Sequence, residues 1–276
     1  HVSDAVLACA PGARIRLPPH ITGSLHSLGQ AHIRTPHREL QIGNRDRAGT
    51  QYRGLDLRAL AHPTGNEAAP LQAGAARAKA NRVCAAHLAQ HLALKGHRVL
   101  AIDLDPQASL TALHGIQPEL DDVPSLYETL RYDDERKPIS EVIRPTNFPN
   151  LDIVPASLEL QEYEYDTPVA LTSSDPHEGR TFFTRISKAL SEVDDRYDVV
   201  VIDCPPQLGY LTLTALTASS SVIVTVHPQM LDVMSMSQFL LMLGGIMKTI
   251  RDAGANMRLK WFRYLVTRFE PTDGPQ

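Results

Sequence analysis

The first 84 residues of this 276-residue chain contain no Phe, Trp or Met and only one aromatic residue, Tyr52. They also hold eight of the sixteen glycines. A segment without large apolar side chains buries little area, and at about 25 cal/mol per Å² that area does not offset the entropy lost on ordering the chain. We therefore expect no stable independent domain in residues 1–84, and interpret them as an atypical basic segment without a fixed fold.

Cysteine and long apolar runs are scarce as well. Three widely separated cysteines (Cys9, Cys84 and Cys204) form neither a disulfide framework nor a zinc-ligand spacing, and Cys204 is interpreted as a small structural residue at a buried strand end. The longest strongly apolar run, 239–247, falls far short of the roughly 20 residues that span a bilayer. We expect a soluble intracellular protein without a membrane partner. Because the sequence lacks an initial Met and ends in Thr-Asp-Gly-Pro-Gln, we also expect a fragment.

Positive charge is scarce outside the first segment. Residues 1–84 carry eleven basic and five acidic side chains, whereas residues 85–276 carry sixteen basic and twenty-six acidic ones. The second part is therefore no indiscriminate polyanion binder, and contact with DNA would need a local basic patch. The candidate patch is Lys248, Arg251, Arg258, Lys260, Arg263 and Arg268, and the alternative is a solvated helix face beside cations that flank a strand.

From Ala85 onward, short apolar runs alternate with amphipathic helical stripes. This alternation predicts an α/β fold, a mostly parallel doubly wound sheet with helices on both faces, truncated at both ends. Residues 133–149 are expected to be surface loop and 166–180 a mobile insertion. We expect strands at 98–103, 151–154, 197–203, 221–226 and 262–267, and helices at 85–96, 125–130, 181–193, 211–218 and 235–253.

Two apolar strands end in acids. Asp103 and Asp105 follow the first strand of this region, and Asp203 ends the unbroken Val/Ile strand further on. The carboxyl ends of parallel strands line one crevice, and Mg²⁺ binds there through one or two carboxylates plus phosphates. The alternative is that these acids only cap the turns that follow them. Because both acidic strand ends are followed by Pro, we favour the magnesium site.

These segments resemble the ParA-type partition ATPases. Val99-Leu-Ala-Ile-Asp-Leu-Asp-Pro-Gln-Ala-Ser109 resembles the second acidic motif of that family, and Tyr197-Asp-Val-Val-Val-Ile-Asp-Cys-Pro-Pro206 resembles its Walker B strand. The segments 151–157 and 227–238 resemble further family motifs, and the latter is most similar to the RepA proteins of repABC-type plasmids. The resemblance covers roughly residues 85–276 and implies a P-loop NTPase fold.

The resemblance also implies roles for the strand-end acids. Asp103 would help to hold the Mg²⁺ shell, Asp105 would position the attacking water, and Asp203 would act on Mg²⁺ through water, with ATP as the nucleotide. It further implies a homodimer formed around ATP, binding to DNA without sequence preference, and a ParB/RepB-type centromere-binding partner that stimulates turnover. The expected location is the bacterial cytoplasm, in association with the nucleoid.

The phosphate-binding loop of that family is missing. Its second Lys should lie about twenty-two residues before Asp103, but the segment 76–84 contains no glycine, and neither Lys79 nor Arg82 supplies the backbone geometry that turns N–H groups toward phosphates. We expect a helix extending back to Ala75 instead. Either a natural family member has lost nucleotide binding, or residues 1–84 are translated out of frame, and we favour the second explanation.

Two functions remain in competition. The first is a plasmid partition ATPase that, as written, binds ATP weakly or not at all, with no nucleotide-contacting residue assigned. The second is a non-enzymatic module that binds DNA or a ParB-type partner without turnover. A septum-site or nitrogenase-iron-protein relative is a weaker alternative, because the segments 105–107 and 228–232 argue against it.

Overall fold

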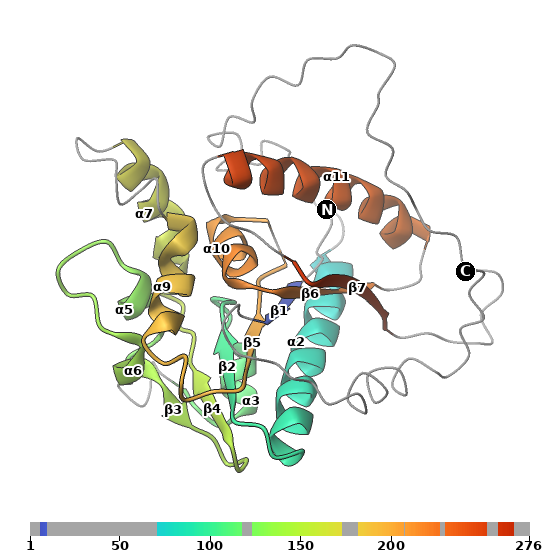
Figure 1. Ribbon diagram of the computed structural model, residues 1–276. Coiled ribbons are helices and arrows are strands. Elements are labelled where there is room, and N and C mark those ends of the chain that lie inside the picture. The colour runs from blue at the N-terminus through green and yellow to red at the C-terminus, as the bar shows by residue number, and fades with distance from the viewer. Residues whose placement is uncertain are drawn as a thin grey trace.

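The computed structural model places the acid-bearing strands at the centre of one sheet (Figure 1). In the described part of the chain the strand order is β3-β4-β2-β5-β1-β6-β7. The structure describes residues 6–9, 71–117, 123–172, 182–206, 208–226, 230–252 and 259–267. The strands are β1 (Val6–Cys9), β2 (Val99–Asp103), β3 (Arg144–Pro145), β4 (Leu151–Val154), β5 (Val199–Asp203), β6 (Ser221–Val226) and β7 (Trp261–Val266).

The sheet is mostly parallel, which confirms the predicted fold class. Strand β2 pairs in parallel with β4 and with β5, and β6 pairs in parallel with β7. The exceptions are β3, which runs antiparallel to β4, and β1, which runs antiparallel between β5 and β6. The unbroken Val/Ile run of β5 is buried at every position, as a central strand covered on both faces requires.

Helices cover both faces of this sheet, with α2 on one side and α9 and α10 on the other (Figure 1). Because side chains alternate along a strand, Val99 and Ala101 of β2 pack with α2, whereas Leu100 and Ile102 pack with the opposite layer. The helices are α2 (Leu71–Leu94), α3 (Ser109–Leu113), α5 (Leu126–Leu130), α6 (Ile139–Val142), α7 (Leu160–Thr172), α9 (Arg185–Ser191), α10 (Tyr210–Ala218) and α11 (Met230–Asp252), and the 3₁₀ turn η2 spans Phe182–Thr184.

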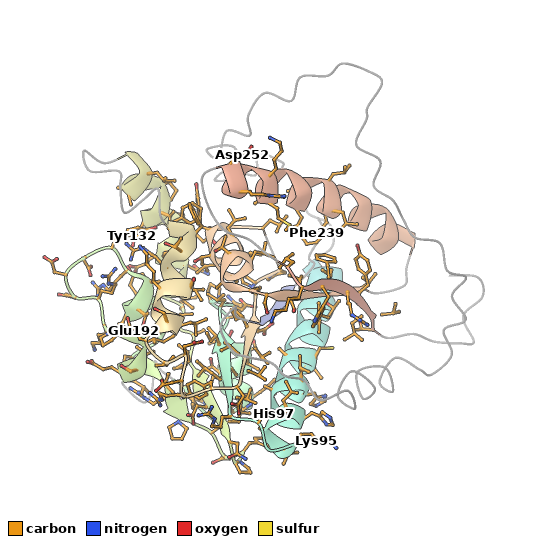
Figure 2. All side chains as sticks on the ribbon, viewed as in Figure 1. Lys95, His97, Tyr132, Glu192, Phe239 and Asp252 are labelled. Carbon is orange, nitrogen blue, oxygen red and sulfur yellow. The ribbon has the colours of Figure 1, made fainter. Side chains whose placement is uncertain are left out.

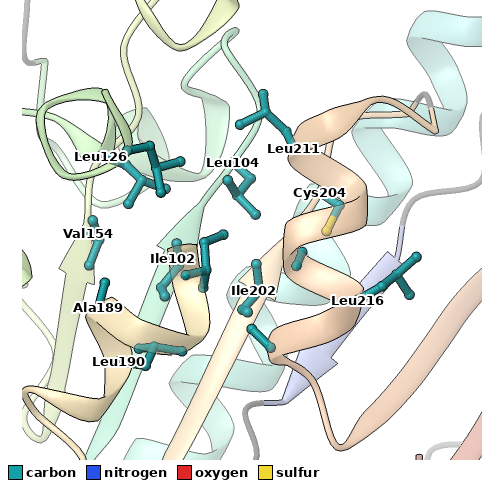
Figure 3. Close-up of a cluster of buried hydrophobic side chains, with 14 of the residues drawn as sticks. Ile102, Leu104, Leu126, Val154, Ala189, Leu190, Ile202, Cys204, Leu211 and Leu216 are labelled. Carbon is teal, nitrogen blue, oxygen red and sulfur yellow. The ribbon is translucent and has the colours of Figure 1, made fainter. Parts of the chain in front are cut away.

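The larger core cluster lies between the sheet, α9 and α10. Figure 3 shows Ile102 and Ile202 of the sheet beside helical side chains that reach the same layer. All the residues labelled there are buried: Ile102, Leu104, Leu126, Val154, Ala189, Leu190, Ile202, Cys204, Leu211 and Leu216. This packing holds the carboxyl ends of β2 and β5 in place.

Two expected loops contain regular structure, so those expectations are wrong in part. The segment 133–149 holds α6 and β3, and α7 continues to Thr172 through the first part of the segment 166–180; residues 173–181 lie outside the described residues. Helix α7 contains Pro168 in its interior. Before this proline, Tyr163 stacks on the Tyr132 ring, and Thr167 and the Tyr132 hydroxyl share a 2.9 Å hydrogen bond. Both contacts lie on the N-terminal side of the proline, and they anchor the first part of α7 to Tyr132.

Strand β1 lies in the segment for which no fixed fold was expected. Its residues, Val-Leu-Ala-Cys, pair with β5 and β6, so this short apolar run is ordered by its neighbours in the sheet. Residues 10–70 lie outside the described residues. Helix α11 also begins at Met230, five residues before the expected start.

Candidate site at the strand ends

The two strand-end acids lie side by side. Asp103 and Asp203 are partners in the parallel register of β2 and β5, and both side chains are fully buried. The backbone N–H of Leu104 donates to the Asp203 carbonyl at 2.9 Å, so the pairing continues one residue past the strands. The structure therefore brings these two acids to one point of the sheet edge, as the sequence predicts.

Asp103 accepts three hydrogen bonds from its own surroundings. Its Oδ2 accepts from the backbone N–H and the hydroxyl of Thr111, both at 2.8 Å, and its Oδ1 accepts from the backbone N–H of Asp105 at 3.1 Å. The Thr111 hydroxyl in turn accepts from the N–H of Ala156 at 2.9 Å, just after β4. Asp103 thus connects three segments of the chain, so the capping role is real whether or not a metal ion binds.

Asp105 lies in the turn between β2 and α3. Its side chain is buried, and its Oδ1 accepts from the backbone N–H of Gln107 at 3.0 Å. Ala108, the residue before α3, adopts a left-handed conformation with φ 49°, which costs energy for a residue with a Cβ. The strained turn keeps Asp105 close to Asp103 and places a second carboxylate at this edge of the sheet.

Burial raises the pKa of Asp103 to about 6, and the nearby charge of Asp105 adds to the shift, while the hydrogen bonds from Thr111 oppose it. The same environment acts on the thiol of Cys204. Burial, followed by the charges of Asp203, Asp105 and Asp103, raises the pKa of Cys204 well above its usual value. Cys204 is 2% exposed, as expected of a small structural residue.

The donor chemistry at this edge suits Mg²⁺ only in part. Carboxylate oxygens are the ligands that Mg²⁺ prefers, and one or two of them suffice when phosphates and water complete the shell. Among the residues that the structure describes, however, no group of three or more His, Cys, Asp or Glu side chains could hold a metal ion. Oδ2 of Asp103 accepts two hydrogen bonds and Oδ1 accepts one, so Oδ1 keeps a lone pair for a magnesium ion or for its water shell.

The geometry does not suit a tightly held triphosphate. Cys84 of α2 packs against the core layer that holds Val199 and Val201 of β5, and burial together with the charge of Asp203 raises the pKa of its thiol. Leu71, the first residue of α2, lies thirteen residues earlier, about 20 Å along a helix that rises 1.5 Å per residue. The helix is continuous past the strand ends, so its free N–H groups are far from them. Within the described ranges no glycine-rich loop faces the acids.

The candidate DNA patch is only partly described. Lys248 and Arg251 lie on the last turns of α11, and Lys260 directly precedes β7, all three exposed; Arg258 and Arg268 lie outside the described residues. The Lys248 ammonium pairs with Asp252 at 2.8 Å, one helical turn later. Figure 2 shows Asp252 at the exposed end of α11. Arg263, the remaining member, lies over the Trp261 ring at 5.8 Å. The DNA-binding role stays a prediction.

Comparisons with known proteins identify the family of this chain. The model of the AAA domain family matches residues 79–257. The chain is 32% identical to the sporulation initiation inhibitor protein Soj of Bacillus subtilis over 182 residues. The aligned region covers 61% of this chain and 67% of Soj. The chain belongs to the ParA-type family. The expected resemblance to ParA-type partition ATPases, close to RepA, is confirmed.

Two rhizobial proteins named as replication protein A are more similar to this ParA-type chain. The protein from Sinorhizobium fredii is 76% identical over 192 residues, which cover 70% of this chain and 47% of that protein. The protein from Rhizobium rhizogenes is 60% identical over 195 residues, which cover 70% of this chain and 48% of that protein. The chain thus spans about half the length of these curated relatives.

Solved structures of ParA-like fold are similar as well. Cobyrinic acid a,c-diamide synthase from Mycobacterium smegmatis, solved with bound ADP and magnesium, matches with 30% identity and a TM-score of 0.54, covering 68% of this chain and 69% of that one. A plasmid partition protein from Borrelia burgdorferi matches with a TM-score of 0.54 and 24% identity, covering 70% of this chain and 76% of that one. This match shows that the two proteins share a fold. No helix in the described part of this ParA-type chain is long and apolar enough to cross a membrane.

Sequence reasoning missed two residues that organise this edge of the sheet. Thr111 was not predicted: its N–H and its hydroxyl donate to Asp103 from the third residue of α3, and a threonine eight residues after an acid is not by itself a sequence signal for this contact. Glu164 was not predicted either: it accepts from the backbone N–H groups of Tyr210 at 2.8 Å and Leu211 at 2.9 Å, and so caps α10. Nothing in the sequence points to this contact, because the partners lie 46 and 47 residues apart.

Proposed function

We propose that this chain serves plasmid partitioning as a ParA-type core that keeps the acids of the ATPase site but holds ATP weakly or not at all. The observation that carries the proposal is helix α2, which is continuous from Leu71 to Leu94 past the acids. Phosphate binding in this class needs successive N–H groups turned toward the phosphates, and a helix interior has used these groups in its own hydrogen bonds.

The proposed roles of the acids rest on the family resemblance and are supported by their placement. Bound Mg²⁺ would neutralise the charge that develops on a transferring phosphoryl group. Asp203 and Asp103 would reach its water shell from two neighbouring strands, and Asp105 would orient a water molecule from the turn after β2. With the phosphate loop replaced by helix, we derive no hydrolytic step for this chain.

The experiment is an ATPase assay of the full 276-residue chain, alone and with duplex DNA and a ParB-type partner. We expect turnover indistinguishable from that of the Asp203→Ala variant under every condition. Stimulated turnover that depends on Asp203 would contradict the proposal and would assign the chain as a competent partition ATPase. A matched control is Asp134→Ala, an exposed acid far along the chain from both acidic strands.

The second candidate function is a module that binds DNA or the ParB-type partner without turnover. It is favoured by the same observation, because loss of the phosphate loop leaves the sheet and its helices packed. A binding assay with each macromolecule in the absence of nucleotide tests it. Binding that is equal with and without ATP supports the module, whereas binding that requires ATP contradicts it.

We further propose that residues 1–84 are translated out of frame, with residues 85–276 forming a partial ParA-type domain. Their lack of Phe, Trp and Met and the helix at the place of the phosphate loop support this explanation. Translating the encoding DNA around codons 70–90 in the other two frames tests it. A Gly-rich Lys-Thr loop in one of them is the expected result, and its absence from both favours a natural member without nucleotide binding.

A further inference from the structure

A cavity of about 320 Å³ lies away from the strand ends, between the end of α5, the loop that leads to α6, and α9. This volume falls at the lower end of the range for small-ligand sites, about 300–1,000 Å³. No lining residue belongs to a strand of the sheet. The lining residues are Thr129, Arg136, Lys137, Pro138, Arg185, Lys188, Ala189 and Glu192. In Figure 2, Glu192 lies beside α5 and α6, on the side of the molecule opposite α2.

The cavity is strongly cationic. Four of its lining residues are Arg or Lys and one is acidic, in a part of the chain whose overall balance is negative. Arg136, Lys137 and Lys188 are exposed and form no ion pair within the described part of the chain. By contrast, Arg131 in the same loop pairs with Asp133 at 2.6 Å and with Glu135 at 3.0 Å. The positive charge of the cavity is therefore not neutralised locally.

The base of the cavity is rigid. Arg185 is buried, its Nη1 donates to the carbonyls of Leu130 at 3.0 Å and Arg131 at 2.9 Å, and its guanidinium lies 3.9 Å from the centre of the Tyr132 ring. These contacts fix the end of α5 to the start of α9. The cavity thus has a preformed wall on which a ligand loses little further protein entropy.

The wall of the cavity contains one buried hydroxyl, that of Thr129. It is 6% exposed, lines the cavity, and its Oγ1 has no hydrogen-bond partner among the described residues. A buried hydroxyl without a partner is costly, and such groups are rare in folded proteins. Because this hydroxyl oxygen is shielded from solvent, the exposed cations that line the cavity, and not Thr129, would make the contacts to a ligand.

We propose that this cavity binds a phosphate group. Guanidinium and ammonium groups converge on it from a loop and a helix, and charge-assisted hydrogen bonds from such groups to phosphate are roughly twice as strong as neutral ones. The group comes either from a free phosphorylated small molecule or from a nucleic-acid backbone. The site is separate from the acids of β2 and β5, and its existence does not depend on the proposed function.

The test is a calorimetric titration of the full chain, at low ionic strength, with inorganic phosphate and separately with pyrophosphate. The test variant is the double substitution Lys137→Ala/Lys188→Ala. Both lysine side chains are exposed, so their removal leaves the core packing unchanged. The control is Lys95→Ala, an exposed cation in the turn after α2. We expect saturable pyrophosphate binding that weakens at least about tenfold in the double variant and stays unchanged in the control.

A parallel titration with a 20-base-pair DNA duplex distinguishes the two sources. Weakened pyrophosphate binding in the double variant assigns a free phosphorylated ligand, and weakened duplex binding without any pyrophosphate binding assigns the nucleic-acid backbone. A Thr129→Val variant, which keeps the shape of the wall and removes only a shielded hydroxyl, should bind either probe as the unmodified chain does. If the double variant binds both probes as the unmodified chain does, or if neither probe binds, the proposal is wrong.

Discussion

At the scale of single residues, Asp103 shows how one side chain can serve both fold and site. The carboxylate accepts three hydrogen bonds, from Thr111 and from the backbone of Asp105, while it lies fully buried beside Asp203. Each such bond stabilises the ionised form of Asp103. The cost of removing its charge from water is larger than this stabilisation, and the pKa of Asp103 is therefore raised to about 6.

The raised pKa predicts a specific dependence of stability on pH. Since the folded state holds the proton of Asp103 more tightly than the unfolded state, the stabilising contribution is complete below pH 4 and is lost as the pH rises through about 6. Melting temperatures of the unmodified chain and of Asp103→Asn, measured from pH 4 to pH 7, check this. The unmodified chain should lose stability relative to the variant across this interval.

The exposed Asp134→Asn is the matched control for that comparison. Its melting temperature should follow that of the unmodified chain at every pH. A constant difference between the unmodified chain and Asp103→Asn from pH 4 to pH 7 would contradict the assignment of a raised pKa to Asp103.

A second residue-scale prediction concerns the cap of α10. Glu164 accepts from the N–H groups of Tyr210 and Leu211, and a Cβ added at Gly209 would meet the Glu164 carboxylate. Glu164→Ala should lower the free energy of unfolding by about 1–3 kcal/mol, because it leaves two N–H groups of a buried helix without a partner. Chemical denaturation measures the loss.

The effects of substitutions at Glu164 and Gly209 on stability should be coupled. Gly209→Ala displaces the Glu164 carboxylate in the unmodified chain, but it displaces nothing once Glu164 has been shortened to Ala. The cost of Gly209→Ala should therefore be smaller in the Glu164→Ala background, which a double-mutant cycle measures. Additive costs would show that the cap is not the shared cause.

At the scale of elements, helix α2 decides the properties of the strand-end site. The absence of glycine in residues 76–84 predicts the helix, and the structure confirms it, with Ala85, Ala89 and Leu92 buried against the sheet. The Val/Ile run of β5 was predictable for the same kind of reason, since local composition determined the element.

Elements that depend on distant contacts were not predictable in this way. Strand β1 is four residues long and is ordered by pairing with β5 and β6, far along the chain. Helix α7, which includes Pro168, is anchored by contacts of Tyr163 and Thr167 with Tyr132, more than thirty residues earlier. Asp103 and Asp203 could be identified from the sequence because each is the last residue of an apolar strand. Glu164 lies inside α7, and only the tertiary structure brings it to the start of α10.

The continuity of α2 can be tested at Val83, an exposed position in its interior. Proline there removes a backbone hydrogen bond and clashes with the preceding turn, which costs about 3 kcal/mol or more in a helix. Val83→Pro should lower the free energy of unfolding by that order and reduce the helical circular dichroism, and Val83→Ala should do neither. Unchanged stability in Val83→Pro would mean that residue 83 lies in a loop.

At the scale of the whole molecule, a ParA-type sheet and its two helical layers are present, and the strand-end acids are assembled. What differs is the connection between β1 and β2, where a helix of 24 residues occupies the place at which the family has its phosphate loop. The molecule therefore combines a family core with two adjacent strand-end acids, and the proposed loss of nucleotide binding rests on the continuous helix beside them. The cationic cavity beside α9 is a separate feature of the same core.

The most direct measurement is a titration of the full 276-residue chain with fluorescently labelled ATP in the presence of Mg²⁺. A continuous α2 predicts no saturable binding in the micromolar range, and the same trace for Asp203→Ala. Micromolar affinity that Asp203→Ala abolishes would show that a functional triphosphate site exists at the strand ends, and would contradict the central conclusion.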